Sequence, residues 1–190
     1  ACETELEIPL GPLDAEAAAS KISGIQAKNL ARTPIADSLA AVKKDLKDAG
    51  GPALIVLVTD GEETCDGDPA QVIAELSKSG IEVSLNIVGF AIDDQELADQ
   101  FTAWAEAGGG RYLAANDTES LAESVADALT QTFDVFDQDG TTVMSGRVDG
   151  ETVALESGPY RLVIKNTNGR KAHKIQITSG NTIVLEPSRQ

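Results

Sequence analysis

The sequence feature that most constrains the fold is an unbroken apolar run in the first half of the chain. Residues 52–65 read P-A-L-I-V-L-V-T-D-G-E-E-T-C, and the apolar part, from Ala53 to Val58, is short and rich in β-branched residues. Such a run, bounded by Gly-Pro and Asp-Gly, predicts a central strand of a parallel sheet that is covered on both faces. Ligands of open α/β sheets bind where strands end at their carboxyl side. Asp60, which follows this strand, is therefore a candidate ligand for a hard cation.

Strand and helix patterns alternate on either side of this run. Residues 4–10 alternate polar and apolar side chains, as an edge strand does, and 82–90 and 111–114 are further predicted strands. Helices are predicted over 13–25, 34–49, 69–80, 95–107 and 119–129. The expected residues at or near their amino ends are Asp14, Thr33, Asp68, Asp93 or Asp94, and Thr118. This alternation predicts an α/β fold with a doubly wound, mostly parallel sheet.

A different pattern begins at residue 133. Short predicted strands (142–148, 152–156, 160–165, 173–178 and 182–185) are separated by turn signals such as Asp139-Gly140 and Asp149-Gly150. They predict a small all-β antiparallel sandwich or barrel. Residues 133–190 carry seven acidic and seven basic side chains, so the whole net charge of −16 lies before them. We therefore expect two domains, 1–132 and 133–190.

The net charge and the hydropathy exclude several classes of partner. A surface with a net charge of −16 does not attract nucleic acid or anionic membranes. No apolar run approaches the roughly 18 residues that a membrane-spanning helix needs. The chain begins Ala-Cys-Glu-Thr without an initiator Met, so we expect a processed product or a piece of a longer protein.

Several strings in the first 132 residues resemble a known family. T-P-I-A-D-S-L, L-I-V-L-V-T-D-G-E-E-T-C-D-G-D-P, I-V-G-F and G-G-G-R-Y-L-A-A follow one another as in a bacterial von Willebrand factor type A domain. The strings D-Q-D-G-T-T-V, S-G-P-Y-R-L-V-I and S-G-N-T-I-V-L resemble the small carboxypeptidase-regulatory-like β-sandwiches that follow such domains in secreted bacterial proteins.

The first resemblance implies a metal-ion-dependent adhesion site. Thr33 matches the Thr of the family's second loop and Asp60 the Asp of its third loop. The implied ion is Mg²⁺, with Mn²⁺ or Ca²⁺ as alternatives, and a carboxylate of a protein partner is expected to complete its shell. The Asp-x-Ser-x-Ser of the family's first loop does not occur in this chain, and Ala31 stands where a Gly is usual. A chain without metal is therefore the alternative.

The same resemblance implies that the first strands of the family's sheet are missing here. Their absence leaves a gap of two strand widths, roughly 10 Å, beside the central strand and bares its edge. We expect this edge to be covered by a companion segment, by a second copy of the chain, or by a shifted 4–10 strand.

Cys2 and Cys65 are the only cysteines. An even pair in an architecture of the exported type favours one disulfide and a periplasmic or extracellular location, with two unrelated thiols in a reducing compartment as the alternative. In the loop-entropy model the bridge stabilises the fold by about 4 kcal/mol.

Other chemistry-bearing residues have simpler interpretations. An Asp-Gly after a strand is often only a turn, and Thr33 fits a helix cap with or without metal. The acidic residues Glu62, Glu63, Asp66 and Asp68 fit a solvated loop better than a calcium loop. No nucleophile–base arrangement assembles around His173, the only histidine. We therefore expect a non-enzymatic, metal-dependent binding or adhesion module; a metal-independent scaffold that assists a separate enzyme is the alternative.

Overall fold

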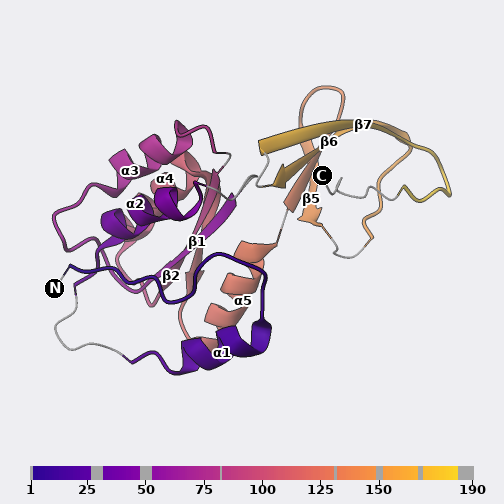
Figure 1. Cartoon of the computed structure of the whole chain (residues 1–190). Coiled ribbons are helices and arrows are strands. Elements are labelled where there is room, and N and C mark those ends of the chain that lie inside the picture. Colours follow the sequence, from indigo (N-terminus) through magenta and orange to yellow (C-terminus); the bar gives the residue numbers. More distant parts are fainter. Residues whose placement is uncertain are drawn as a thin grey trace. The chain divides into compact units, whose positions relative to one another are not determined.

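Figure 1 shows the computed structural model of the chain, which describes residues 2–26, 32–47, 53–81, 83–130, 132–148, 152–166 and 169–183. The chain divides into two compact units, Ala1–Leu129 and Thr130–Gln190. This division lies three residues before the expected boundary at 132. The first unit holds a parallel sheet with helices and the second an antiparallel sheet, so the protein is mixed α/β with a separate all-β unit.

A three-stranded parallel sheet in the order β1-β2-β3 forms the centre of the first unit. β1 (Ala53–Thr59) pairs along its whole length with β2 (Val83–Phe90). β2 pairs on its other side with β3 (Gly109–Ala115), with a register shift between Leu85 and Ile87. The three predicted strands are present and parallel, because a crossover helix separates each strand from the next. The expectation that Ala53–Val58 forms a central strand covered on both faces is wrong for the described residues: β2 is central, and β1 is an edge strand whose residues are mostly only partly buried.

Helices cover both faces of this sheet (Figure 1). On one face α2 (Ile35–Asp45), α3 (Pro69–Ser77) and α4 (Gln95–Ala107) pack against the sheet around Leu85, Ile87 and Phe101. On the other face α5 (Thr118–Leu129) packs around Val88 and Ala128. None of the helices in the described residues is both long enough and apolar enough to span a membrane.

Most of the expected helix caps are confirmed. Asp14 caps α1 (Ala15–Ser23), Asp68 caps α3 and Asp94 caps α4, each with its carboxylate accepting a backbone amide of the first turn. The expected cap at Thr118 is wrong by one residue. The Asp117 carboxylate accepts the Ser120 amide at 2.8 Å, and this bond holds the pKa of Asp117 below its usual value.

Residues 2–14 have irregular backbone, so the expected strand at 4–10 is wrong. Pro9 lacks the amide that a ladder needs, and the segment pairs with no strand of the described residues. A shifted 4–10 strand therefore does not cover the outer edge of β1, where Val58 is 48% exposed. The segment leading into and through α1 buries none of its large apolar side chains, namely Leu6, Ile8, Leu10, Leu13, Ile22 and Ile25.

The second unit is built on a four-stranded antiparallel sheet in the order β5-β4-β6-β7. Its strands are β4 (Thr132–Phe136), β5 (Thr142–Arg147), β6 (Gly158–Asn166) and β7 (Gly169–Ile177). The predicted Asp139-Gly140 turn joins β4 to β5, and Gly140 supplies the positive φ of 83° that the turn requires. One face of the sheet forms a small core around Val135, Leu162 and Ile164.

The second sheet of the expected sandwich does not occur in the described residues. Residues 152–156 were predicted as a strand, but they pair with no strand there. Thr182 and Ile183 are likewise outside any strand, and the rest of the predicted 182–185 strand lies outside the described residues, as does Asp149-Gly150.

Candidate functional site

Asp60 stands at the carboxyl end of β1, where the sequence predicted a cation ligand. β1 ends at Thr59, whose hydroxyl donates to the carbonyl of Gly61 at 2.8 Å and so turns the chain sharply. Asp60 is exposed at this turn, and its carboxylate has no hydrogen-bond or ion-pair partner in the described part of the chain.

Thr33 lies against the loop that Asp60 begins. The Thr33 amide donates to the Thr64 hydroxyl at 2.7 Å, and the Thr33 carbonyl accepts the Thr64 amide at 3.1 Å. Arg32 adds a bond from its guanidinium to the Thr64 carbonyl at 3.0 Å. Gly67 passes so close to the start of α2 that a Cβ there would collide with that of Ala36. The two predicted metal ligands are thus carried by segments that are bonded to each other.

The start of α2 is capped by Glu63, and not by Thr33 as expected. The Glu63 carboxylate accepts the Ala36 amide through Oε2 at 2.7 Å and the Cys65 amide through Oε1 at 2.6 Å. Pro34 occupies the cap position without a side-chain bond. The Thr33 hydroxyl caps nothing, and no residue of the described ranges bonds it.

The expected disulfide between Cys2 and Cys65 is present. It ties the irregular amino-terminal segment to the same loop, two residues beyond Glu63. The loop from Asp60 to Asp68 is therefore held at Thr64, at Glu63 and at Cys65, and it ends at the cap of α3, where Asp68 accepts the Gln71 amide at 3.0 Å.

A buried hydroxyl lies near this end of the sheet. Tyr112 of β3 lays its ring across Gly89, which pairs with Thr59, and only a glycine leaves room for that ring. The Tyr112 hydroxyl is buried and has no hydrogen-bond partner in the described residues. Burial raises the pKa of this phenol, because it disfavours the charged form.

The acidic residues of the loop do not converge. Asp68 is used as a helix cap, Glu63 as the cap of α2, and Glu62 and Asp66 are exposed. Within the described ranges, no group of three or more His, Cys, Asp or Glu side chains is placed to hold a metal ion. Asp60 and Thr33 therefore remain predicted ligands, and two such oxygen groups would leave most of an octahedral shell to water or to a partner.

The roles of Glu63 and Thr64 were not found from the sequence. Each bonds a residue about thirty positions away, so no local pattern reveals the pairing. The one available signal was Pro34, whose side chain has no acceptor and so leaves the amides of the first turn of α2 to another segment.

Comparison with known proteins yields relatives but no function. No family model matches the chain. The chain is similar to the uncharacterized protein YwmD of Bacillus subtilis strain 168, with 42% identity over 94 residues, which are 48% of this chain and 42% of that protein. It is also similar to the uncharacterized protein YwmC of the same strain, with 42% identity over 85 residues, 44% of this chain and 36% of that protein. The matches thus span less than half the length of these relatives.

Proposed function

We propose that the first unit is a von Willebrand factor type A-like domain that binds a protein partner at the carboxyl end of its parallel sheet. A divalent cation, Mg²⁺ or alternatively Mn²⁺ or Ca²⁺, is held there by Asp60 and Thr33. The observation that carries this proposal is the exposed Asp60 carboxylate, free of any described partner, at the end of β1. Oxygen ligands of this kind suit Mg²⁺, which keeps several waters and needs few protein groups.

The bonding of the loop supports a binding role. Glu63, Thr64 and Cys65 fix the loop to the start of α2 and to the amino-terminal segment, so Asp60 and Thr33 are presented on a preorganised surface. A rigid site loses little conformational entropy when a partner binds. The partner's carboxylate then completes the cation shell.

The function proposed is binding without catalysis. His173, the only histidine of the sequence, lies in β7 of the second unit, whereas Asp60 and Thr33 lie in the first. The proposed location is periplasmic or extracellular. The disulfide supports this location, because such bonds persist in oxidising compartments.

Metal titration tests the proposal. Thermal unfolding is followed by the fluorescence of Trp104, the only tryptophan, which is buried in the first unit and reports on that unit alone. A cation at 100 times its Kd should stabilise the unit by about 2.7 kcal/mol. Asp60→Asn should abolish the shift. Asp66→Asn removes the same charge from the same loop at a positive φ that Asn tolerates, and it should keep the shift.

A metal-independent scaffold that assists a separate enzyme is the second candidate. It is favoured by the absence of a three-residue His, Cys, Asp or Glu group in the described part of the chain. Under this function, millimolar Mg²⁺, Mn²⁺ and Ca²⁺ leave the unfolding temperature of the wild type and of both Asp variants unchanged.

The outer edge of β1 supports a further part of the proposal. Its backbone groups pair with no strand of the described residues, and exposed strand edges recruit other strands. We propose that a companion segment or a second copy of the chain covers this edge. Sedimentation over a wide concentration range separates the two, since only a second copy gives a monomer–dimer equilibrium. Hydrogen exchange tests both ways of covering the edge. If the β1 amides that do not face β2 exchange rapidly while the partner is present, then neither a companion segment nor a second copy covers this edge.

A further inference from the structure

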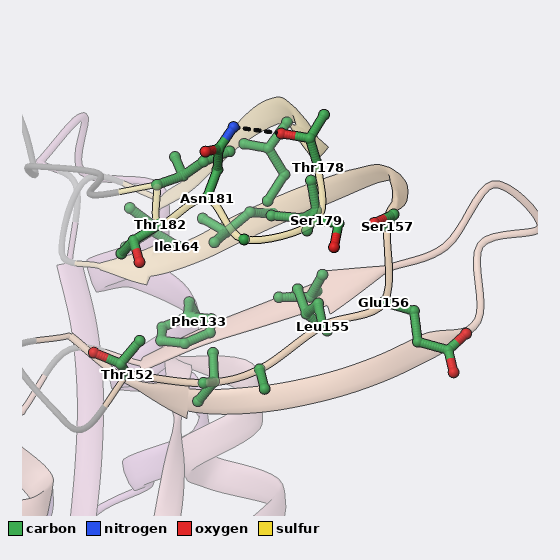
Figure 2. Close-up of a pocket in the computed structure, with 18 of the residues that line it drawn as sticks. Phe133, Thr152, Leu155, Glu156, Ser157, Ile164, Thr178, Ser179, Asn181 and Thr182 are labelled. Carbon is green, nitrogen blue, oxygen red and sulfur yellow. Dashed lines mark hydrogen bonds between the residues drawn. The ribbon is translucent and has the colours of Figure 1, made fainter.

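The second unit contains a half-open cavity that the proposed function does not use. Its volume is about 890 Å³, and it lies between the antiparallel sheet and two irregular segments, 152–157 and 178–183 (Figure 2). Sites for small organic ligands have volumes of roughly 300–1,000 Å³. The cavity is therefore large enough for a whole ligand.

The floor of the cavity is the apolar face of the sheet. Alternate residues of each strand point to the same face, so β4 contributes Phe133 and Val135, β6 contributes Leu162 and Ile164, and β7 contributes Ile175. All but one of these side chains are aliphatic. A sheet face presents side chains and no free amides, so it does not fit an added peptide strand, which needs a sheet edge.

The walls are fixed by bonds of their own. The Tyr160 hydroxyl of β6 donates to the Glu156 carbonyl at 3.1 Å and so anchors the segment that carries Leu155. On the opposite wall, the Asn181 side-chain amide donates to the Thr178 hydroxyl at 2.7 Å, as the dashed line in Figure 2 shows.

The polar groups stand at the two ends of the cavity. Figure 2 shows Thr152 and Thr182 at one end, with Phe133 between these two threonines, and Ser157 and Ser179 at the other end. None of these four hydroxyls has a hydrogen-bond partner in the described residues. The charged residues of the lining are Arg147 and Glu156, so its net charge is zero and favours no charged head group.

We propose that this cavity binds one uncharged amphiphile with an aliphatic chain and a hydroxyl head, such as a fatty alcohol. The aliphatic floor takes the chain, and the hydroxyls at one end, which bond no described residue, take the head group. This site is independent of the proposed cation site in the first unit.

Displacement of a fluorescent probe tests the proposal with the whole chain. N-phenyl-1-naphthylamine should bind at a single saturable site and be displaced by dodecanol. Leu155→Asp puts a charge into the cavity from a segment outside the sheet, and it should weaken both affinities by about tenfold or more. Val143→Asp is the matched control, since Val143 is an exposed side chain of β5 that does not line the cavity. If Leu155→Asp disturbs the far-ultraviolet circular dichroism, the half-exposed Val153→Asp replaces it.

Methyl NMR shows where the ligand binds, and the methyl signals of Ile164 and Ile175 should shift with dodecanol. Equal affinity in the wild type and the cavity variants would overturn the proposal. So would shifts confined to the exposed apolar residues Leu6, Ile8 and Leu10 of the first unit. Stronger displacement by dodecanoate or dodecylammonium would refute the uncharged head group. A dimer that Leu155→Asp dissociates would show that a second copy occupies the cavity instead.

Discussion

Replacing Glu63 by alanine should destabilise the first unit more than replacing any other acidic residue of the loop from Asp60 to Asp68. One carboxylate accepts two amides, from Ala36 at the start of α2 and from Cys65 in the loop, at 2.7 and 2.6 Å. A net gain of about 1 kcal/mol for each partly buried bond, plus about 0.5 kcal/mol from the helix dipole, gives a loss of about 2.5 kcal/mol.

The assay is urea unfolding monitored by Trp104 fluorescence, which reports the first unit without interference from the second. Glu62→Ala is the control, because Glu62 is the exposed neighbour and has no partner in the described residues; its effect should stay within about 0.5 kcal/mol. Glu63→Gln keeps one acceptor oxygen but turns an NH₂ toward the second amide, so it should lose about half as much as Glu63→Ala.

The outcome that would refute the reasoning is equal stability of the Glu63→Ala and Glu62→Ala proteins. The clamp between the loop and α2 would then contribute nothing, and Asp60 would not be presented by a rigid loop. If Glu63→Gln instead matched Glu63→Ala, the charge of Glu63 would matter more than its geometry.

Three further predictions concern the same unit. Replacing both Cys2 and Cys65 by serine should lower its stability by about 4 kcal/mol in the loop-entropy model, as measured by urea unfolding; an unchanged midpoint would mean that the bridge does not restrict the unfolded chain. Tyr112→Phe should leave stability unchanged or raise it at pH 7, because it removes a buried hydroxyl without a described partner. Since burial raises the folded-state pKa of Tyr112, the wild type should lose stability as the pH rises above about 10, where the unfolded phenol ionises first, and Tyr112→Phe should lose less; parallel pH profiles would contradict this. Asn86→Ala should cost about 2–3 kcal/mol, since the buried Asn86 donates to the Ala128 carbonyl at 2.6 Å and accepts the Arg111 amide at 2.9 Å; a loss below 0.5 kcal/mol, the size expected of a surface change, would show that water replaces it.

Local patterns predicted the regular elements of the first unit. The apolar run ending at Thr59 predicted β1, and Asp-Pro at Asp68 predicted the start of α3, because the composition of a short run and the capping of a helix can both be seen in neighbouring residues. The same locality explains the error at Thr118. Asp117 and Thr118 are both good caps, and only the backbone conformation decides that Asp117 reaches the Ser120 amide.

Patterns that need a partner from elsewhere were predicted less well. The alternation in 4–10 and the polar and apolar residues of 152–156 suit strands, but a strand forms only where another strand offers its amides and carbonyls. Neither segment has such a neighbour in the described residues, and 152–156 lines a cavity instead.

By itself, the sequence determined that Asp60 follows an apolar strand, that the chain has two units, and that its two cysteines form an even pair. The tertiary structure alone decided how Asp60 is presented, because the bonds that join its loop to α2 and to the amino-terminal segment link residues far apart in the chain. Glu63 caps a helix 27 residues before it, Thr64 pairs with Thr33, and Cys65 bonds Cys2 across 63 positions. Such contacts depend on how β1 and α2 pack together, and no local propensity encodes that packing.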